Sequence, residues 1–237
     1  MSALIKLPCI LAVSVALHVA HTSPSKSPST EHTTIDGMFE RVVQCGTSII
    51  KLVKGIFWAI GVAEMAAIIV TMFQSSEIDP RIASALIKTG NAEDLYLTPL
   101  STMGAMLVVT GALVRWKCYR TLKSLFTFEV SIRKDHTLVT SWPYSVVRHP
   151  GYSGMLAVHI GMYCWCGSRG SWLRESGILD TVGGKAVVIC FATLEMGVLG
   201  GLLTRMPIED AALKKEFGLQ WDEWAQKVPY ALIPSVY

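Results

Sequence analysis

Long apolar runs alternate with shorter polar stretches along the chain, and this pattern predicts helices that cross a membrane. A spanning helix needs about 17–25 mostly apolar residues. Five segments reach or approach that length, at residues 4–20, 49–73, 96–114, 152–166 and 182–203. The tail that follows, residues 204–237, begins with the pattern of an amphipathic helix. We therefore expect an all-α fold, a multi-pass transmembrane bundle of about five helices.

Composition supports a membrane protein with one domain. Hydrophobic residues make up 51% of the 237 residues and charged residues only 16%, whereas soluble domains carry roughly 25% charged residues. Because no linker separates two cores, we expect a single domain over residues 1–237. The net charge of +3 gives no indication of a nucleic-acid partner.

Basic residues in the short loops predict how the bundle is oriented. Residues 117–150 contain six lysines and arginines and the tail contains four, whereas residues 74–95 contain two of them against four acidic residues. Cytosolic loops carry the excess of basic residues, so loop 117–150 and the tail are expected to face the cytosol. This orientation requires the first apolar segment to remain as a helix. The alternative is a signal peptide cleaved after Ala20, which would invert the bundle.

Polar and small residues inside the apolar segments have mostly structural interpretations. Glu64 and Glu195 lie mid-segment, where carboxylates are rare and face a bundle interior; a helix–helix hydrogen bond is favoured over a substrate role. The third segment ends at Arg115, Trp116 and Lys117, which together are expected to anchor it at the membrane interface. The six cysteines show no metal-ligand spacing, so no metal site is predicted. Five glycines are expected to allow close helix packing, namely Gly154, Gly161, Gly197, Gly200 and Gly201.

The first candidate for chemistry is the polar stretch 136–154. It places Arg148, His149 and Tyr152 around a turn-forming Pro-Gly pair, just before the fourth apolar segment. Polar groups are costly to keep at the mouth of a membrane helix. The stretch therefore suggests a site for a polar ligand at the edge of the bilayer.

The second candidate lies in the tail. Arg205 and Glu209 are four residues apart, so on a helix they share one face. Apolar residues at positions 212, 213 and 217 form a stripe for packing on the bundle or the membrane, and Gly218 is placed as a C-cap. Taken alone, this pattern is also that of an ordinary amphipathic helix with one surface ion pair.

Together the two motifs resemble the isoprenylcysteine carboxyl methyltransferase family. The first matches its His-x-Leu-Val, then Pro-Tyr, then Arg-His-Pro-x-Tyr-x-Gly pattern. The second matches Arg, a Glu four residues later with an acidic neighbour, then Leu, Phe-Gly and two aromatic residues. The match covers residues 136–154 and 205–224, and is similar to fungal members with a short N-terminus. It implies a catalytic part at 117–237 behind N-terminal transmembrane helices at 1–116.

The resemblance implies methyl esterification of the C-terminal isoprenylcysteine carboxylate of prenylated proteins, with S-adenosylmethionine as the methyl donor. The expected acceptors are farnesyl- or geranylgeranyl-cysteine proteins processed from CaaX ends and presented at membrane lipid. The family's location implies the endoplasmic reticulum membrane. The implied cofactor pocket is cytosolic and is formed by loop 117–150 and the C-terminal amphipathic helix.

The resemblance also implies a role for individual residues. Arg205 is similar to the catalytic residue that meets the prenylcysteine carboxylate, and Glu209 to the acidic residue that holds polar groups of the donor. Nine residues match the donor wall, namely His136, Thr137, Leu138, Val139, Tyr144, His149, Pro150, Gly151 and Tyr152. The chain departs from the family pattern at Trp142, where Gly is usual before Pro-Tyr, and at Asp210, where a second Glu is more common. Trp221 and Trp224 stand where Tyr is more common.

The chemistry of this reaction agrees with the residues available. An α-carboxyl group has a pKa of about 3.5, so the nucleophile is already ionised at neutral pH and needs no general base. One alternative function is a phospholipid N-methyltransferase acting on phosphatidylethanolamine. A more distant alternative is a non-enzymatic helical membrane protein or transporter, in which Glu64 and Glu195 would be the functional residues.

Overall fold

The computed structural model describes residues 2–22, 37–72, 86–88, 92–123 and 137–236, and the regular elements of these residues are helical. Two short 3-10 turns, η2 (Ala92–Asp94) and η4 (Ile178–Asp180), connect longer elements. The α-helices are α1 (Ser2–Ala20), α2 (Gly37–Met72), α4 (Pro99–Leu122), α5 (Pro150–Gly167), α6 (Trp172–Glu175), α7 (Val182–Phe217) and α8 (Leu219–Lys227).

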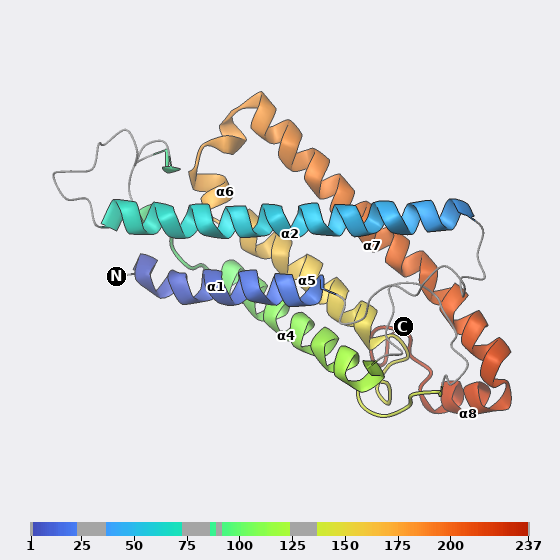
Figure 1. Cartoon of the computed structure of the whole chain (residues 1–237). Coiled ribbons are helices and arrows are strands. Elements are labelled where there is room, and N and C mark those ends of the chain that lie inside the picture. Colours follow the sequence, from blue (N-terminus) through green and yellow to red (C-terminus); the bar gives the residue numbers. More distant parts are fainter. Residues whose placement is uncertain (1, 23–36, 73–85, 89–91, 124–136, 237) are drawn as a thin grey trace.

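The five predicted apolar segments correspond to α1, α2, α4, α5 and α7, although α4 begins at Pro99, three residues later than predicted, and residue 73 lies outside the described residues. The all-α fold is confirmed. Three helices of the described residues are long and apolar enough to cross a membrane, within Ala3–Ala20, Ser48–Val70 and Val182–Phe217. The protein is therefore a helical membrane protein, while the total of five spans stays a prediction. In Figure 1, α1 and α2 run side by side in opposite directions, and α4, α5 and α7 cross them obliquely.

Local sequence signals explain where the helices begin and end. Thr98 caps α4 through a reciprocal pair of hydrogen bonds with Ser101, and Thr181 accepts a hydrogen bond at 3.0 Å from the backbone N–H of residue 184 at the start of α7. Pro150 is the first residue of α5, a position where a missing N–H is tolerated. Gly218 ends α7 with a φ of 52°, a left-handed value that favours glycine. The predicted C-cap at Gly218 is confirmed.

The closest packing in the bundle joins α4 to α5 through two glycine pairs. A Cβ atom added at Gly104 would lie 2.6 Å from the carbonyl oxygen of Gly161, and the reverse distance is also 2.6 Å. Seven residues further along α4, a Cβ at Gly111 would lie 2.5 Å from the carbonyl oxygen of Gly154. Such approaches are possible only without side chains. The predicted packing role of Gly154 and Gly161 is confirmed.

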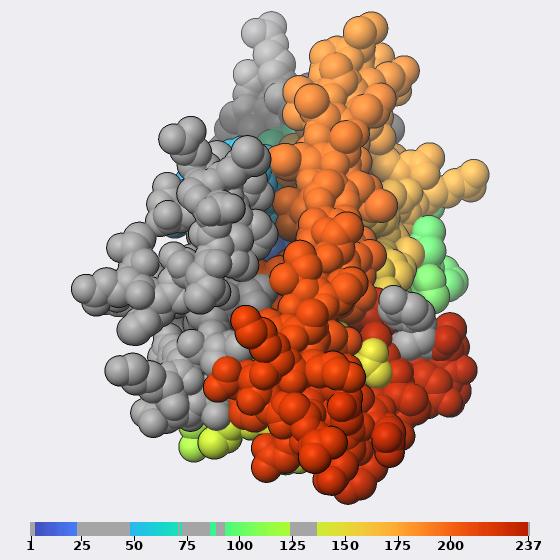
Figure 2. Space-filling view, turned by 90° about the vertical axis from the view of Figure 1, so that its right-hand side faces the viewer, coloured from blue at the N-terminus to red at the C-terminus, as the bar shows by residue number. Residues whose placement is uncertain are grey.

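The other three glycines were expected to behave in the same way, and that expectation is wrong for the described part of the chain. Apart from the nearby backbone of α7 itself, no described atom lies within 4 Å of a Cβ added at Gly197, Gly200 or Gly201, and all three are exposed. Figure 2 shows α7 running along one face of the molecule, from its orange beginning to its red end. A glycine in a helix therefore does not by itself indicate that this face of the helix packs against another helix.

A buried ion pair accounts for one of the two intramembrane carboxylates. The Nζ atom of Lys6 in α1 donates to Glu64 in α2 and to the carbonyl oxygen of Gly170, and both charged side chains are almost fully buried. Glu64 also accepts a hydrogen bond from the backbone N–H of Trp172 at 3.2 Å. Buried charges are tolerated when they are paired and hydrogen-bonded. The structural interpretation of Glu64 as a helix–helix contact is confirmed.

The expected interfacial anchor of α4 is wrong for Arg115, whereas Trp116 next to it is exposed and its role at the interface stays a prediction. The helix continues for two more turns to Leu122, and Arg115 lies on its buried face, 3% exposed, in line with Val108 and Gly111. Its Nε donates to the carbonyl oxygen of Ala20 at 2.7 Å and its Nη1 to that of Gly151 at 2.9 Å. Arg115 therefore joins the last turn of α1 to the first turn of α5.

Candidate functional site

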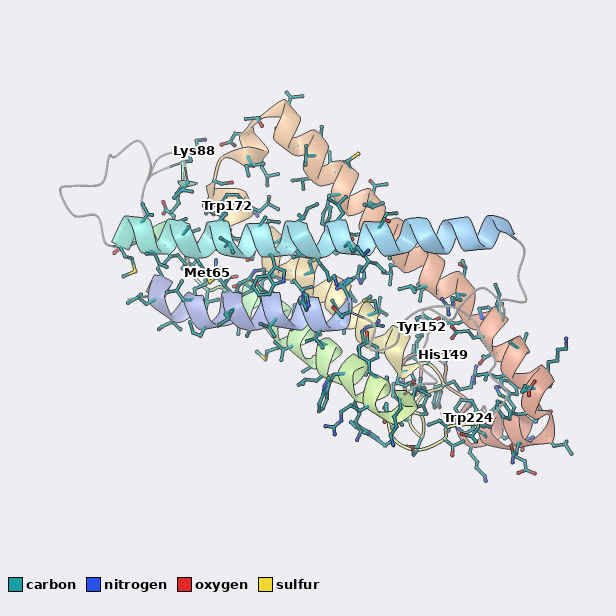
Figure 3. The ribbon with its side chains drawn as sticks, viewed as in Figure 1. Met65, Lys88, His149, Tyr152, Trp172 and Trp224 are labelled. Carbon is teal, nitrogen blue, oxygen red and sulfur yellow. The ribbon has the colours of Figure 1, made fainter. Side chains whose placement is uncertain are left out.

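The two motifs meet where α5 begins and α7 leaves the bundle. Figure 3 shows His149, Tyr152 and Trp224 close together at this end, whereas Lys88 and Trp172 lie at the opposite end. Loop residues 137–149 and the tail therefore share one end of the bundle, in agreement with the charge pattern. Which side of the membrane this end faces stays a prediction.

The C-terminal segment holds the first motif in place. The backbone N–H groups of Arg148 and His149 donate to the carbonyl oxygens of Tyr230 at 2.9 Å and Ala231 at 2.8 Å. The Nη1 atom of Arg148 also donates to the carbonyl oxygen of Pro229. These bonds hold the turn before α5, and their acceptors lie in the C-terminal segment, outside the motif. They could not be predicted from the sequence, because the pattern of that segment indicates only coil.

Two neighbouring carboxylates on α7 hold the polar side chains of the first motif. Glu209 Oε1 accepts hydrogen bonds from the hydroxyl of Tyr152 at 2.7 Å and from Nε of Arg205 at 2.9 Å. Asp210 accepts from Nε2 of His149 at 3.0 Å and from Nε of Arg148 at 3.3 Å. α7 is one continuous helix from Val182 to Phe217. Its first part is the predicted fifth span, and its later part carries both carboxylates.

His149 is the most buried member of this cluster and lies between the two carboxylates. Its Nδ1 is 3.6 Å from Glu209 and its Nε2 is 3.0 Å from Asp210, and its side chain is 6% exposed. Burial alone lowers the pKa of His149, but its pairing with the carboxylates of Asp210 and Glu209 outweighs burial and raises that pKa above 6.5. A protonated His149 would donate to both acidic side chains.

Tyr144 lies at the edge of this cluster, where α8 reaches the loop. Its carbonyl oxygen accepts a hydrogen bond from the indole of Trp224 at 3.3 Å, and burial raises the pKa of the Tyr144 hydroxyl well above its usual range. Trp224 thus fastens α8 to the loop. Trp142, which departs from the family pattern, has an exposed ring with Lys117 Nζ 5.3 Å from its centroid. The large side chain therefore lies outside the cluster and does not obstruct it.

The structure brings some predicted residues together and leaves others apart. His149, Tyr152, Arg205 and Glu209 form one hydrogen-bonded cluster, and Pro150 and Gly151 begin the helix beside it. His136 lies outside the described residues. Residues 137–139 form an irregular segment, and no described hydrogen bond joins it to the two carboxylates. The cluster also contains Arg148 and Asp210, which lie inside the two motifs but were assigned no individual role from the sequence.

The fold and the cluster define a class of protein: a helical membrane protein with a polar site at one end of its helix bundle. Residues 104–168, which include most of α4, the first motif and all of α5, match the model of the isoprenylcysteine carboxyl methyltransferase (ICMT) family. The resemblance predicted from the motifs is confirmed.

Plant proteins are among the relatives that the chain matches. It is 30% identical over 132 residues to protein-S-isoprenylcysteine O-methyltransferase B of Arabidopsis thaliana, covering 55% of this chain and 57% of the relative. It is 30% identical over 131 residues to a probable protein-S-isoprenylcysteine O-methyltransferase of Oryza sativa subsp. indica, covering 54% and 59%. The chain therefore spans a little over half the length of these relatives. No solved structure matches it. The predicted closeness to fungal members stays a prediction.

Proposed function

We propose that the protein is a membrane methyltransferase that esterifies the C-terminal carboxylate of prenylated cysteine and uses S-adenosylmethionine as the methyl donor. One observation carries this proposal. The chain of hydrogen bonds from Tyr152 through Glu209 to Arg205 joins the two family motifs into one site. We further propose that this site faces the cytosol at the endoplasmic reticulum membrane.

The donor set of the cluster fits the polar groups of S-adenosylmethionine. That molecule carries an ammonium group, ribose hydroxyls and a positively charged sulfonium, and it supplies the methyl group when bound. Glu209 and Asp210 offer carboxylate oxygens that can accept hydrogen bonds from the ammonium and hydroxyl groups, and an ionised carboxylate has about four acceptor positions. Glu209 can therefore keep Tyr152 and Arg205 and accept a further hydrogen bond.

Arg205 is placed to hold the acceptor. Its guanidinium is oriented by Glu209 through Nε, and a guanidinium can grip a carboxylate with two parallel hydrogen bonds. It lies where α7 passes from its apolar half to its charged half. The apolar half exposes large side chains such as Val187 and Ile189, which suit contact with lipid. A prenyl chain could thus lie along the bilayer while its carboxylate reaches Arg205.

The cluster needs to orient and shield the reactants, and no proton has to be moved. In the reaction a carboxylate oxygen of the acceptor forms a bond to the methyl carbon while the carbon–sulfur bond breaks, and its electron pair stays on sulfur. The acceptor is ionised already because its pKa is about 3.5. Opposite charges are neutralised as the ester forms, so a site shielded from water favours the step. Correct positioning of two reactants can contribute several kcal/mol.

Charge-removing variants test the assigned roles. Arg205→Ala should reduce transfer to farnesylcysteine by roughly 30-fold or more, because the acceptor carboxylate loses a charged partner worth about 2–5 kcal/mol. Donor binding should survive in this variant, since Glu209 keeps its contacts with Tyr152 and His149. Glu209→Ala should weaken donor binding instead. Labelled S-adenosylmethionine in nanodiscs measures both binding and transfer.

Lys214→Ala supplies a matched control on the same helix. Lys214 forms an exposed ion pair with Asp222 at 2.8 Å, away from the cluster, and such pairs contribute about 0–1 kcal/mol. This variant should bind donor and transfer methyl groups as the wild type does. Full transfer by Arg205→Ala, or unchanged donor affinity in Glu209→Ala, would remove the proposed roles.

A further inference from the structure

A second group of polar side chains is buried in the bundle, apart from the carboxylate cluster. It consists of His21 just after α1, His159 in α5 and Glu195 in α7. Their exposures are 4%, 1% and 1%. We propose that these three residues bind a divalent transition-metal ion, Zn²⁺, that ties α1 to α5 and α7. This proposal is independent of the methyltransferase function.

The orientation of both imidazoles supports metal binding. Nδ1 of His21 lies 2.8 Å from the carbonyl oxygen of Leu17, and Nδ1 of His159 lies 2.9 Å from that of Met155. A carbonyl oxygen only accepts, so each Nδ1 carries the proton, and in the neutral ring each Nε2 presents a lone pair. Metal-binding histidines are commonly oriented in this way by a hydrogen bond from the other ring nitrogen.

Both Nε2 atoms lack a hydrogen-bond partner among the described residues although they are buried. Nε2 of His159 lies 3.2 Å from Oε2 of Glu195, but not in hydrogen-bonding geometry. Two acceptor atoms at this separation repel each other unless a proton or a cation lies between them. Buried polar groups are rarely left unpaired, and a shared cation would pair all three side chains at once.

The distances suit a small ion. The ligand atoms of the three residues all lie within 4.8 Å of one another. Zinc binds imidazole nitrogen and carboxylate oxygen at about 2.0–2.2 Å, which places ligand atoms of a tetrahedral site roughly 3.3–3.6 Å apart. The His159–Glu195 pair is already at 3.2 Å, and the remaining pairs require a movement of roughly 1 Å. Two histidines and one carboxylate leave a fourth position for water.

Two further observations concern the surroundings of the three ligands and their positions in the sequence. Arg115 also faces His21, but its guanidinium donates to the carbonyl oxygens of Ala20 and Gly151. The ligands lie at positions 21, 159 and 195, far apart in sequence, so no spacing motif marks them.

Metal content tests this proposal on the full chain in nanodiscs. After treatment with a chelator, the protein is dialysed against ZnCl₂ and its zinc is measured by mass spectrometry. The wild type should hold one zinc ion per chain. His159→Ala and the nearly isosteric Glu195→Gln should lose it, with zinc affinity falling by more than the roughly 10–100-fold expected for an outer contact. The matched control is His18→Ala, an exposed histidine of α1 that contacts Trp58 and should keep the zinc.

Each result decides between a metal site and a protonated histidine–glutamate pair. Folded wild type that binds no zinc overturns the proposal, and so does zinc retained by folded His159→Ala and Glu195→Gln. If neither variant folds, X-ray absorption at the zinc edge of the wild type decides the matter. A shell of nitrogen and oxygen with two imidazoles supports the site, while sulfur ligands place the ion elsewhere. Methyl transfer is not part of any readout, so failure here leaves the proposed activity unaffected.

Discussion

Tyr152→Phe removes a single oxygen atom from the cluster and tests whether Glu209 is held in position for the donor. The hydroxyl of Tyr152 donates to Glu209 at 2.7 Å, and the ring itself packs beside His149 with centroids 5.5 Å apart. Phenylalanine keeps the ring and loses the hydrogen bond. The substitution therefore changes the orientation of one carboxylate with little change in packing.

The expected size of the effect follows from the contacts that remain. A hydrogen bond to a charged group contributes about 1.5–3 kcal/mol. Glu209 still has Arg205 at 2.9 Å and His149 at 3.6 Å, so it is not left unpaired, and the lower end of that range applies. About 1.5 kcal/mol corresponds to roughly a tenfold rise in the Kd for S-adenosylmethionine. The KM for the prenylcysteine acceptor should change little, because Arg205 is retained.

Tyr163→Phe is the matched control for this measurement. Tyr163 lies eleven residues further along α5, and its hydroxyl donates to the carbonyl oxygen of Ala192 at 3.1 Å, away from the carboxylates. Titration calorimetry or equilibrium binding of labelled donor in nanodiscs gives both Kd values. If Tyr152→Phe binds the donor as tightly as Tyr163→Phe does, Glu209 is not positioned by Tyr152 for donor binding and the reasoning fails.

Two further predictions concern packing and pH. Gly161→Ala should lower the unfolding free energy by about 1–3 kcal/mol, because its Cβ would lie 2.6 Å from the carbonyl oxygen of Gly104. The control Gly197→Ala should leave the unfolding free energy unchanged, because no described atom of another element lies within 4 Å of its added Cβ. Equal losses of Tm in the two variants would refute the packing role of Gly161. The pKa of His149 is raised above 6.5 in the folded protein, so protonation of this side chain stabilises the fold. This stabilisation is fully present below about pH 6.5 and is lost as the pH rises through the pKa of His149 in the folded protein. The Tm difference between wild type and His149→Gln should therefore shrink from pH 6 to 9, and a growing difference would contradict the pairing with Asp210.

Short-range patterns predicted the helices and one contact of the site. Apolar runs that reach or approach spanning length correspond to α1, α2, α4, α5 and α7, because a helix satisfies its own backbone hydrogen-bonding groups in lipid. The four-residue spacing of Arg205 and Glu209 predicted their ion pair, which the structure places at 2.9 Å. Both inferences depend on spacing along one helix.

Long-range contacts could not be predicted in this way. Tyr152 and Glu209 are 57 residues apart, and only the resemblance to a family suggested that they share a site. Arg115 looked like an interfacial cation because basic and aromatic residues end the apolar run, but helix phase turns it toward the carbonyl oxygens of Ala20 and Gly151. The role of Arg115 depends on these contacts with other helices, which cannot be predicted from the periodicity of the sequence.

The measurement that tests the proposed function most directly offers the wild-type protein a choice of acceptors. Purified protein in nanodiscs that contain phosphatidylethanolamine is incubated with methyl-labelled S-adenosylmethionine, with and without N-acetyl-farnesylcysteine or its geranylgeranyl counterpart. We predict label in the prenylcysteine as a methyl ester, which base releases as methanol. Label in phosphatidylethanolamine as base-stable methylamine, or no transfer to either acceptor by protein that is folded, would contradict the proposed function.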